Sequence, residues 1–315
     1  MARTKSSLFL AFFFLLTLTF PLTANSQDND KDEKKSLKDK KNAAAVMWQE
    51  PTDIESRNLL LGAGGEEMKP DLRRLTLIEQ KKGGYSTKYR VRDAAGNEWI
   101  AKIGKEAQPD TAANRLLWAI GYETEIAYLV PHATIEGKGE FENVRLEARP
   151  KDVKRIGEWK WEDNKFKSSP PFQGLKIMMV MINNWDMKDD NNEILATNAG
   201  GEIVHKYIIS DLGGTFGKTG GVITRSRNKP ADYVKADFIK KVKGDYIDFN
   251  YGGKNRPLFE NITVSEAQWL AQLLTRLSDE QIKDAFRAAN YSDTDVEDLA
   301  AAFKERVEAL SSLGK

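Results

Sequence analysis

Short apolar runs separated by turn residues mark the start of the folded part of the chain. Three such runs are Leu75–Ile78, Lys88–Val91 and Trp99–Ile103. Their length and their β-branched or aromatic content are typical of strands. Glycine-containing turns at residues 83–84 and 95–97 separate them. The pattern therefore predicts a three-stranded antiparallel meander.

The spacing of apolar residues then changes from a strand-like to a helical period. Pro109 and Asp110 open a helix that we expect over residues 109–120, and Gly121 ends it. Two further strands are expected at Tyr128–Ile135 and Asn143–Ala148. Residues 46–150 are thus predicted to form an N-terminal lobe with a small antiparallel β-sheet and one helix.

Residues 151–315 are expected to form a second, mainly helical lobe. The run Leu175–Ile182 is long enough for a buried helix, and residues 192–209 have the pattern of a β-hairpin. Helix-start signals follow at Thr263, Ser278 and Ser292, each with Glu, Gln or Asp three residues later. The predicted fold class is therefore α+β, arranged in two lobes.

The first 45 residues have a different composition. Arg3 and Lys5 precede the apolar run Leu8–Phe20, and Ala24-Asn25-Ser26 offers a small-x-small cleavage site. Residues 1–26 are therefore expected to be a signal peptide, and the charged residues 27–45 a disordered linker. An uncleaved anchor is less favoured, because the run is shorter than the roughly 20 residues that a spanning helix needs. We expect a secreted or periplasmic protein with no transmembrane segment after cleavage.

Composition narrows the chemistry. At 315 residues and 40% hydrophobic content the chain can bury a sizeable core. The formal charge of +1 argues against a nucleic-acid binder. The absence of cysteine excludes disulfides, zinc-thiolate sites and cysteine nucleophiles, and the two histidines, His132 and His205, lie far apart. Acid–base chemistry must therefore come from carboxylates.

Four polar positions suggest what that chemistry is. Lys102 lies in the third strand, and Asp186 and Asn191 follow the apolar helix at a spacing of five residues. Asp211, followed by Gly213, closes the predicted hairpin. Transfer of a phosphoryl group from a nucleotide needs a lysine for the phosphates, a carboxylate for the hydroxyl, and an amide and a carboxylate for magnesium. The alternative is an ordinary polar turn at residues 186–192, where Asp and Asn are favoured for local hydrogen bonding.

The order of these motifs resembles the protein-kinase-like superfamily in its atypical branches: the HipA-type kinases, the phosphatidylinositol kinases and the secreted atypical kinases. The resemblance covers roughly residues 72–211. Beyond residue 211, only the helical character of the sequence supports it. It implies a two-lobed fold with a five-stranded small lobe carrying one helix and a mostly helical large lobe. It also implies that ATP and Mg2+ bind between the lobes.

The resemblance assigns roles in the first lobe. Lys102 resembles the third-strand lysine that contacts nucleotide phosphates, and Asp110 resembles the acid that pairs with it from the following helix. Glu106 is the substitute candidate for that acid, and a helix-start acid favoured by the macrodipole is the alternative for Asp110. Gly83 and Gly84 stand in place of a glycine-rich phosphate loop, although the segment is weak as a phosphate cradle and a hairpin turn is the favoured explanation.

The resemblance assigns further roles in the second lobe. Asp186 resembles the catalytic aspartate, and Asn191 and Asp211 resemble the two metal-binding residues. The sequence departs from the pattern in two ways: no His-Arg precedes Asp186, and Leu212 replaces the usual phenylalanine of Asp-Phe-Gly. Lys188 is a candidate for stabilising the transferred phosphoryl group.

Residues 218–243 occupy the place of an activation or substrate loop. Their basic side chains either bind an acidic substrate or simply face solvent; they include Lys218, Arg225, Arg227 and Lys229.

The leading hypothesis is an exported atypical kinase acting on an unknown hydroxyl substrate, with protein, lipid, sugar and small molecule all open as its class. Since ATP is scarce in a bacterial periplasm, a kinase-like pseudoenzyme that binds an envelope component is one alternative. Nucleotidyl transfer on the same scaffold is another. A metal-dependent hydrolase built on four aspartates is the last; they are Asp186, Asp189, Asp190 and Asp211.

Overall fold

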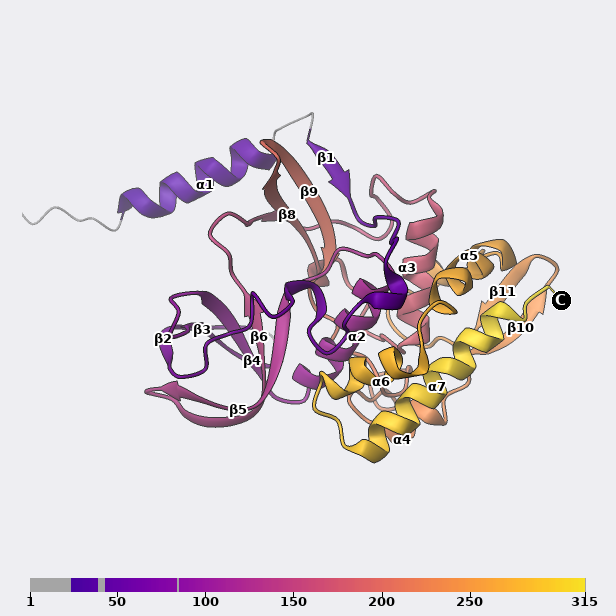
Figure 1. Ribbon diagram of the computed structural model, residues 1–315. Coiled ribbons are helices and arrows are strands. Elements are labelled where there is room, and N and C mark those ends of the chain that lie inside the picture. The colour runs from indigo at the N-terminus through magenta and orange to yellow at the C-terminus, as the bar shows by residue number, and fades with distance from the viewer. Residues whose placement is uncertain (1–23, 39–42, 84, 315) are drawn as a thin grey trace, which may run out of the picture.

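The structure, a computed structural model, describes residues 24–38, 43–83 and 85–314. The first 23 residues of the expected signal peptide, and Gly84 of the glycine pair, lie outside the described residues. Figure 1 shows a small β-lobe and a larger, mostly helical lobe that meet at helix α2 (Ala107–Ala119). Each lobe has its own cluster of buried apolar side chains.

Five strands of the small lobe close into a barrel in the order β2-β3-β4-β6-β5. They are β2 (Leu75–Lys81), β3 (Thr87–Arg92), β4 (Glu98–Ile103), β5 (Ala127–Glu136) and β6 (Gly139–Ala148). Neighbouring strands are antiparallel, as predicted, except β2 and β5, whose short parallel pairing closes the barrel. Because side chains alternate along a strand, Trp99 and Ala101 of β4 fill the barrel while Lys102 lies on its outer face.

Helix α2 joins the two lobes. It begins at Ala107, two residues before the predicted start, since Pro109 is tolerated in the first turn, where its missing N–H has no helical partner to lose. The helix packs against β5 and β6 of the barrel and against α6 of the second lobe. Its apolar residues, such as Leu116 and Ile120, belong to the core of the second lobe. The acid side chains at its start are therefore held in a fixed position between the lobes.

A four-stranded sheet lies in the second lobe next to α2, in the order β1-β9-β8-β7. Its strands are β1 (Ala44–Val46), β7 (Lys154–Gly157), β8 (Asn192–Ala199) and β9 (Glu202–Ile209). Strands β8 and β9 form the predicted hairpin, and β7 lies in the stretch of chain that connects the lobes. The hairpin fixes the positions of the loops before β8 and after β9.

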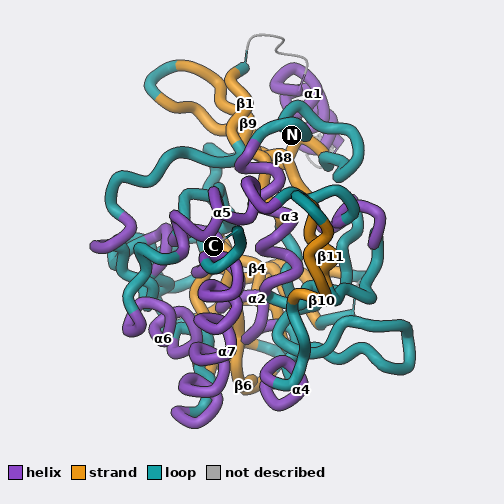
Figure 2. The backbone as a smooth tube through the Cα atoms, turned by 90° about the vertical axis from the view of Figure 1, so that its right-hand side faces the viewer, coloured by secondary structure: helices purple, strands orange, loops and turns teal. Residues whose placement is uncertain are grey.

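Among the described residues, five α-helices belong to the second lobe: α3 (Pro170–Met181), α4 (Pro230–Val234), α5 (Val264–Leu274), α6 (Asp279–Arg287) and α7 (Asp293–Ser311). Helix α7 packs against α4, α5 and α6, and α3 packs against α5 (Figure 2). A small hairpin of β10 (Ile239–Lys243) and β11 (Tyr246–Phe249) accompanies them. The predicted helix starts at Thr263 and Ser278 are complete capping boxes, and Ser292 caps α7 by accepting from the backbone N–H of Asp295.

The composition predicts a disordered linker over residues 27–45, but the structure has helix α1 (Ala24–Lys38) there, followed by β1. Lysine and glutamate are good helix formers, and two lysines in the last turn complement the helix dipole. The ring of His205 contacts the carbonyl of Leu37 at 2.9 Å, and Lys154 pairs with Glu33 at 3.2 Å. These contacts hold the helix against β7 and β9.

The segment after β1 crosses from one lobe to the other. Met47, Ile54 and Leu59 are buried in the second lobe's core. The indole of Trp48 donates to the carbonyl of Ile120 at the end of α2. The segment therefore ties α2 to the large lobe. Within the described part of the chain, no helix has both the length and the apolar character to cross a bilayer.

Candidate active site

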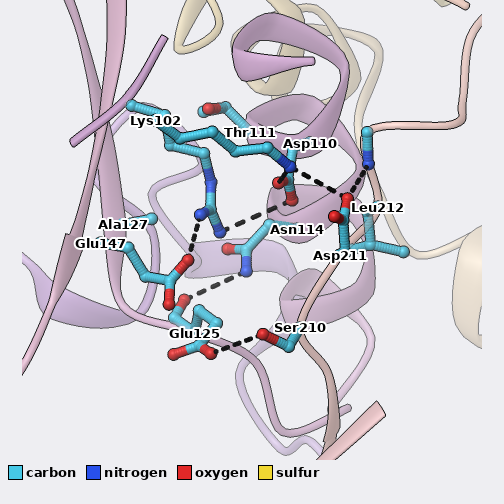
Figure 3. Close-up of polar contacts among 12 residues, drawn as sticks. Lys102, Asp110, Thr111, Asn114, Glu125, Ala127, Glu147, Ser210, Asp211 and Leu212 are labelled. Carbon is cyan, nitrogen blue, oxygen red and sulfur yellow. Dashed lines mark hydrogen bonds and ion pairs between the residues drawn. The ribbon is translucent and has the colours of Figure 1, made fainter. Parts of the chain in front are cut away.

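Lys102 is the centre of a charged cluster between the lobes (Figure 3). Its Nζ lies 2.9 Å from Oδ2 of Asp110 on α2 and 2.9 Å from Oδ1 of Asp211, which follows β9 in the other lobe. Glu106 lies farther away, at 3.5 Å. Only 3% of Lys102 is exposed. A buried amine thus joins a carboxylate of the first lobe's helix to one of the second lobe.

The cluster keeps both partners ionised. Burial by itself would lower the pKa of Lys102, but the carboxylates of Asp110 and Asp211 outweigh burial and raise that pKa. Burial would likewise raise the pKa of Asp211, but the ammonium of Lys102 outweighs it and lowers that pKa. The site therefore holds a permanent cation and a permanent anion side by side.

Asn191 and Asp186 join the cluster through the backbone. The N–H of Asp211 donates to the carbonyl of Asn191 at 3.2 Å. The side-chain Nδ2 of Asn191 donates to the carbonyl of Asp186 at 2.6 Å. A Cβ on Gly214 would lie 3.1 Å from Cβ of Asp186, so the loop after Asp211 also passes close to Asp186. The four polar positions singled out in the sequence therefore lie in one connected cluster.

Two oxygens of this cluster suit a divalent cation. Oδ1 of Asp211 is used by Lys102 and by the N–H of Gly213, at 2.9 and 3.0 Å. No donor in the described part of the chain reaches Oδ2 of Asp211 or Oδ1 of Asn191. Carboxylate and amide oxygens are ligands that Mg2+ accepts, usually together with phosphates and water. The oxygens of Asp211 and Asn191 are therefore of the kind that fits a magnesium ion.

Asp186 is in contact with two lysines. Nζ of Lys254 lies 2.6 Å from its Oδ1, and Nζ of Lys188 lies 3.5 Å from its Oδ2. The sequence analysis points to Lys188 but not to Lys254, which is 68 residues away in a segment without periodicity. No spacing rule connects positions so far apart.

Glu106 has a structural role that the sequence does not reveal. Its Oε2 accepts a hydrogen bond from Oγ of Ser86 at 2.6 Å, and the guanidinium of Arg227 also contacts its carboxylate. Arg227 further stacks over the rings of Tyr85 and Trp185, at 4.4 and 4.6 Å from the ring centroids. The loop after Asp211 is thereby fastened to the first lobe beside Lys102.

Gly83 lies in the turn between β2 and β3. Its φ of +95° lies in the region that favours glycine, and a Cβ there would meet nothing within 4 Å. The backbone conformation of a turn therefore explains this glycine, and its predicted contact with nucleotide phosphates stays a prediction.

Behind Lys102, a buried network of ions continues toward the connection between the lobes. Arg145 lies 3.6 Å from Asp110 and 2.5 Å from Glu147. Arg155 bridges Glu147 and Glu125, at 3.0 and 2.7 Å. Burial, together with repulsion from Glu147, raises the pKa of Glu125 to about 7. These residues come from helix α2, the loop before β5, and strands β6 and β7, which is why a linear motif search does not find them.

The four-aspartate hydrolase centre is not assembled. Oδ1 of Asp189 accepts from the backbone N–H of Trp161 at 3.1 Å, and Asp190 is exposed. Among the described residues, no group of three or more His, Asp or Glu side chains is placed to hold a metal. This alternative has no geometric support.

A cavity of about 520 Å³ lies elsewhere, between the turn after α2, the connection between the lobes, and strands β8 and β9. Charged and aromatic side chains line it, among them Trp118, Glu123, Arg149 and Lys206. It adjoins the ion network through Glu125 and Arg155 but does not include the four polar positions around Lys102.

Comparison with known proteins gives structural neighbours only. No protein-family model matches the chain, and no curated protein matches it. Among solved structures, it is similar to the proinflammatory kinase CtkA of Helicobacter pylori, with a TM-score of 0.48 and 9% identity over 77% of this chain and 96% of that one. It is also similar to the Rio2 kinase of Chaetomium thermophilum, in a complex described as ADP/Mg2+-phosphoaspartate, with a TM-score of 0.35 and 11% identity over 76% of this chain and 72% of that one.

In the described part of the chain, a five-stranded lobe with one helix precedes a second lobe with five further α-helices, and Lys102 meets Asp211 where the two lobes join. The chain therefore has a two-lobed α+β fold, which is the arrangement that the resemblance to the protein-kinase-like superfamily implies.

Proposed function

We propose that the protein is an atypical kinase that transfers a phosphoryl group from Mg-ATP to a hydroxyl-bearing acceptor. One observation carries this proposal: Nζ of Lys102 lies 2.9 Å from Asp110 in one lobe and 2.9 Å from Asp211 in the other. A buried, permanently charged amine next to a carboxylate with a free oxygen is suited to hold phosphates beside a metal ion.

Each polar residue then has a distinct task. Lys102 binds phosphate oxygens of the donor and is oriented by Asp110. Asp211 and Asn191 would hold Mg2+, which when bound would neutralise the charge that develops on the phosphates. Asp186 accepts a hydrogen bond from the acceptor hydroxyl and takes its proton. The acceptor oxygen forms a bond to the γ-phosphorus, the bond from that phosphorus to the bridging oxygen breaks, and ADP leaves.

The proposal includes export, which rests on the amino-acid pattern of residues 1–26 alone. The acceptor is left at the level of a hydroxyl compound, whether protein, lipid, sugar or small molecule.

A binding protein on the same scaffold is the second candidate. The contacts of Asp186 with Lys254 and Lys188 favour this candidate. The two ammonium groups lie against the carboxylate that would have to accept a hydrogen bond from the acceptor hydroxyl. Nucleotidyl transfer remains the third, because the same cluster would also hold an α-phosphate.

Turnover of labelled ATP separates the three. The protein starting at Gln27 is incubated with ATP labelled in the γ- or the α-phosphate, beside Asp211→Ala. A kinase releases ADP and moves only the γ-label, and Asp211→Ala abolishes this release because the metal is lost. Transfer of the α-label indicates nucleotidyl transfer. Binding of Mg-ATP without release of ADP indicates the pseudoenzyme, and turnover that survives Asp211→Ala contradicts the proposed metal site.

A further inference from the structure

Two ammonium groups converge on the carboxylate of Asp186. Lys254 is the nearer one, at 2.6 Å from Oδ1, and Lys188 lies 3.5 Å from Oδ2. The side chains of Asp186, Lys254 and Lys188 are 21%, 42% and 38% exposed. The group of three therefore lies at the mouth of the site, where an acceptor must enter, and not in the interior with Lys102.

Lys254 is held there by a segment built onto the loop that carries Asp186. Its backbone N–H donates to the carbonyl of Trp185 at 2.9 Å. On either side of it, Oη of Tyr251 donates to the carbonyl of Asn184 at 2.8 Å, and Nδ2 of Asn255 donates to the carbonyl of Met187 at 2.5 Å.

The glycine before Lys254 confirms how close this contact is. A Cβ on Gly253 would lie 2.3 Å from Oη of Tyr251 and 2.7 Å from Cα of Trp185. Only a residue without a side chain fits between the two loops. The backbone of Lys254 is therefore fixed relative to Asp186.

This arrangement conflicts with the task of Asp186 unless an anion is present. The carboxylate must accept a hydrogen bond from the acceptor hydroxyl, yet each of its oxygens faces an ammonium group. Drawing Lys254 away costs the contact at 2.6 Å, because the lysine would lose its anion. An acceptor that brings its own anionic group removes this cost, since Lys254 exchanges one anion for another.

The surroundings of Asp186 carry further positive charge. Arg225 stacks over Trp185 at 4.0 Å from the ring centroid. In the part of the chain that the structure describes, no carboxylate pairs with Arg225 or with Lys218. Asp232, the acid of this loop, is already engaged by Lys229 at 3.2 Å and by Ser226 at 2.6 Å. Arg225 and Lys218 therefore leave an excess of positive charge near Asp186.

We propose that the acceptor carries an anionic group, such as a phosphate or carboxylate, close to the hydroxyl that is phosphorylated, and that Lys254 binds this group. The proposal rests on the proposed kinase function and adds the charge class of the acceptor. Lys254 acts in it as a substrate-binding residue that the sequence pattern does not identify.

A matched pair of probes tests this: glycerol and glycerol 3-phosphate, which differ by the anionic group. Their binding is measured by isothermal titration calorimetry in the presence of Mg-ADP, with the wild type, Lys254→Met, Lys254→Arg and the control Lys69→Met. Lys69 is an exposed lysine outside the site whose ammonium pairs with Glu66 at 2.7 Å instead of Asp186.

We expect glycerol 3-phosphate, and not glycerol, to bind the wild type. Lys254→Met should weaken this binding about tenfold or more, which corresponds to loss of one charge contact. Lys254→Arg should retain most of it, and Lys69→Met should leave it unchanged. Equal binding by Lys254→Met, or no preference of the wild type for the phosphorylated probe, overturns the inference.

A second measurement is the release of ADP from Mg-ATP when no acceptor other than water is present. If Lys254→Met raises this release but leaves binding of glycerol 3-phosphate unchanged, Lys254 only blocks Asp186 and the inference fails. Failure of the underlying function looks different, because Mg-ATP would then bind equally to the wild type and to Asp211→Ala. The two proposals are thus tested separately.

Discussion

At the scale of single residues, the central feature is a lysine that is almost completely buried and yet charged. An isolated ammonium group in such a place would be deprotonated or would destabilise the fold. Lys102 is stabilised by Asp110 and Asp211, which approach it from different lobes. Removing either acid leaves Lys102 with one carboxylate at 2.9 Å. We expect the loss of Asp110 to affect mainly stability and the loss of Asp211 to affect mainly metal binding.

Asp110 has the larger expected effect on stability. It is 1% exposed and contacts Lys102 at 2.9 Å and Arg145 at 3.6 Å. We expect Asp110→Asn to lower the free energy of unfolding by about 3 kcal/mol, because two buried cations lose an anion. Urea unfolding measures it, with Glu66→Gln as the control for an exposed pair, where less than about 1 kcal/mol is expected. Equal effects of the two changes would contradict the buried-pair interpretation.

Glu125 gives a pH-dependent prediction. Its pKa in the folded protein is about 7, raised from 4.5 first by burial and then by repulsion from Glu147. Between those two values the folded state holds this proton while the unfolded chain has lost it, so the contribution of Glu125 to stability falls as pH rises from about 4.5 to about 7. Glu125→Gln should therefore gain stability relative to the wild type between pH 5 and pH 8, by up to about 3 kcal/mol. Thermal unfolding at the two pH values checks this, and a pH-independent difference would contradict it.

At the scale of secondary-structure elements, local signals predicted most of the fold. The alternation in residues 75–103 gave the first three strands, and the caps at Thr263 and Ser278 gave the starts of α5 and α6. Helix α1 was missed because its sequence is almost entirely polar. Such a sequence has no apolar periodicity from which a helix can be predicted. The closure of the barrel by β2 and β5 was also missed, since pairing between strands distant in sequence leaves no local pattern.

The candidate site shows the same division. Lys102, Asp186, Asn191 and Asp211 were found because each belongs to a short motif in a fixed order. Lys254 was not found, because its contact with Asp186 depends on the path of the segment after β11.

That segment allows a test at Gly253. Adding a methyl group there forces it against Oη of Tyr251 and Cα of Trp185. Gly253→Ala should lower the free energy of unfolding by about 1–3 kcal/mol and reduce turnover of Mg-ATP, because the loop of Asp186 is displaced. Gly221→Ala is the matched control, since a Cβ there has no neighbour within 4 Å. Urea unfolding and ADP release measure both, and a harmless Gly253→Ala would show that the two loops are not tightly packed.

At the scale of the whole molecule, the second lobe depends on a segment that precedes the barrel in the sequence. Met47, Ile54 and Leu59 are buried in the core of the second lobe, and Nε2 of Gln281 donates to the carbonyl of Ile54 at 2.7 Å. A chain starting at Ala43 should keep its thermal midpoint, whereas one starting at Gly62 should lose roughly 5 kcal/mol or more and fail to fold, given about 1.5–3 kcal/mol per buried side chain. Similar midpoints for the two chains, measured by circular dichroism, would contradict this role of the segment.

The account as a whole depends on Asp211 holding a divalent ion next to a nucleotide bound by Lys102. Calorimetric titration with ATP, with and without Mg2+, tests this in the wild type, in Asp211→Asn and in the control Asp190→Asn, an exposed aspartate next to Asn191. We predict that Mg2+ strengthens ATP binding by the wild type and by Asp190→Asn, and that Asp211→Asn loses this gain. A gain from Mg2+ that persists in Asp211→Asn would contradict the account.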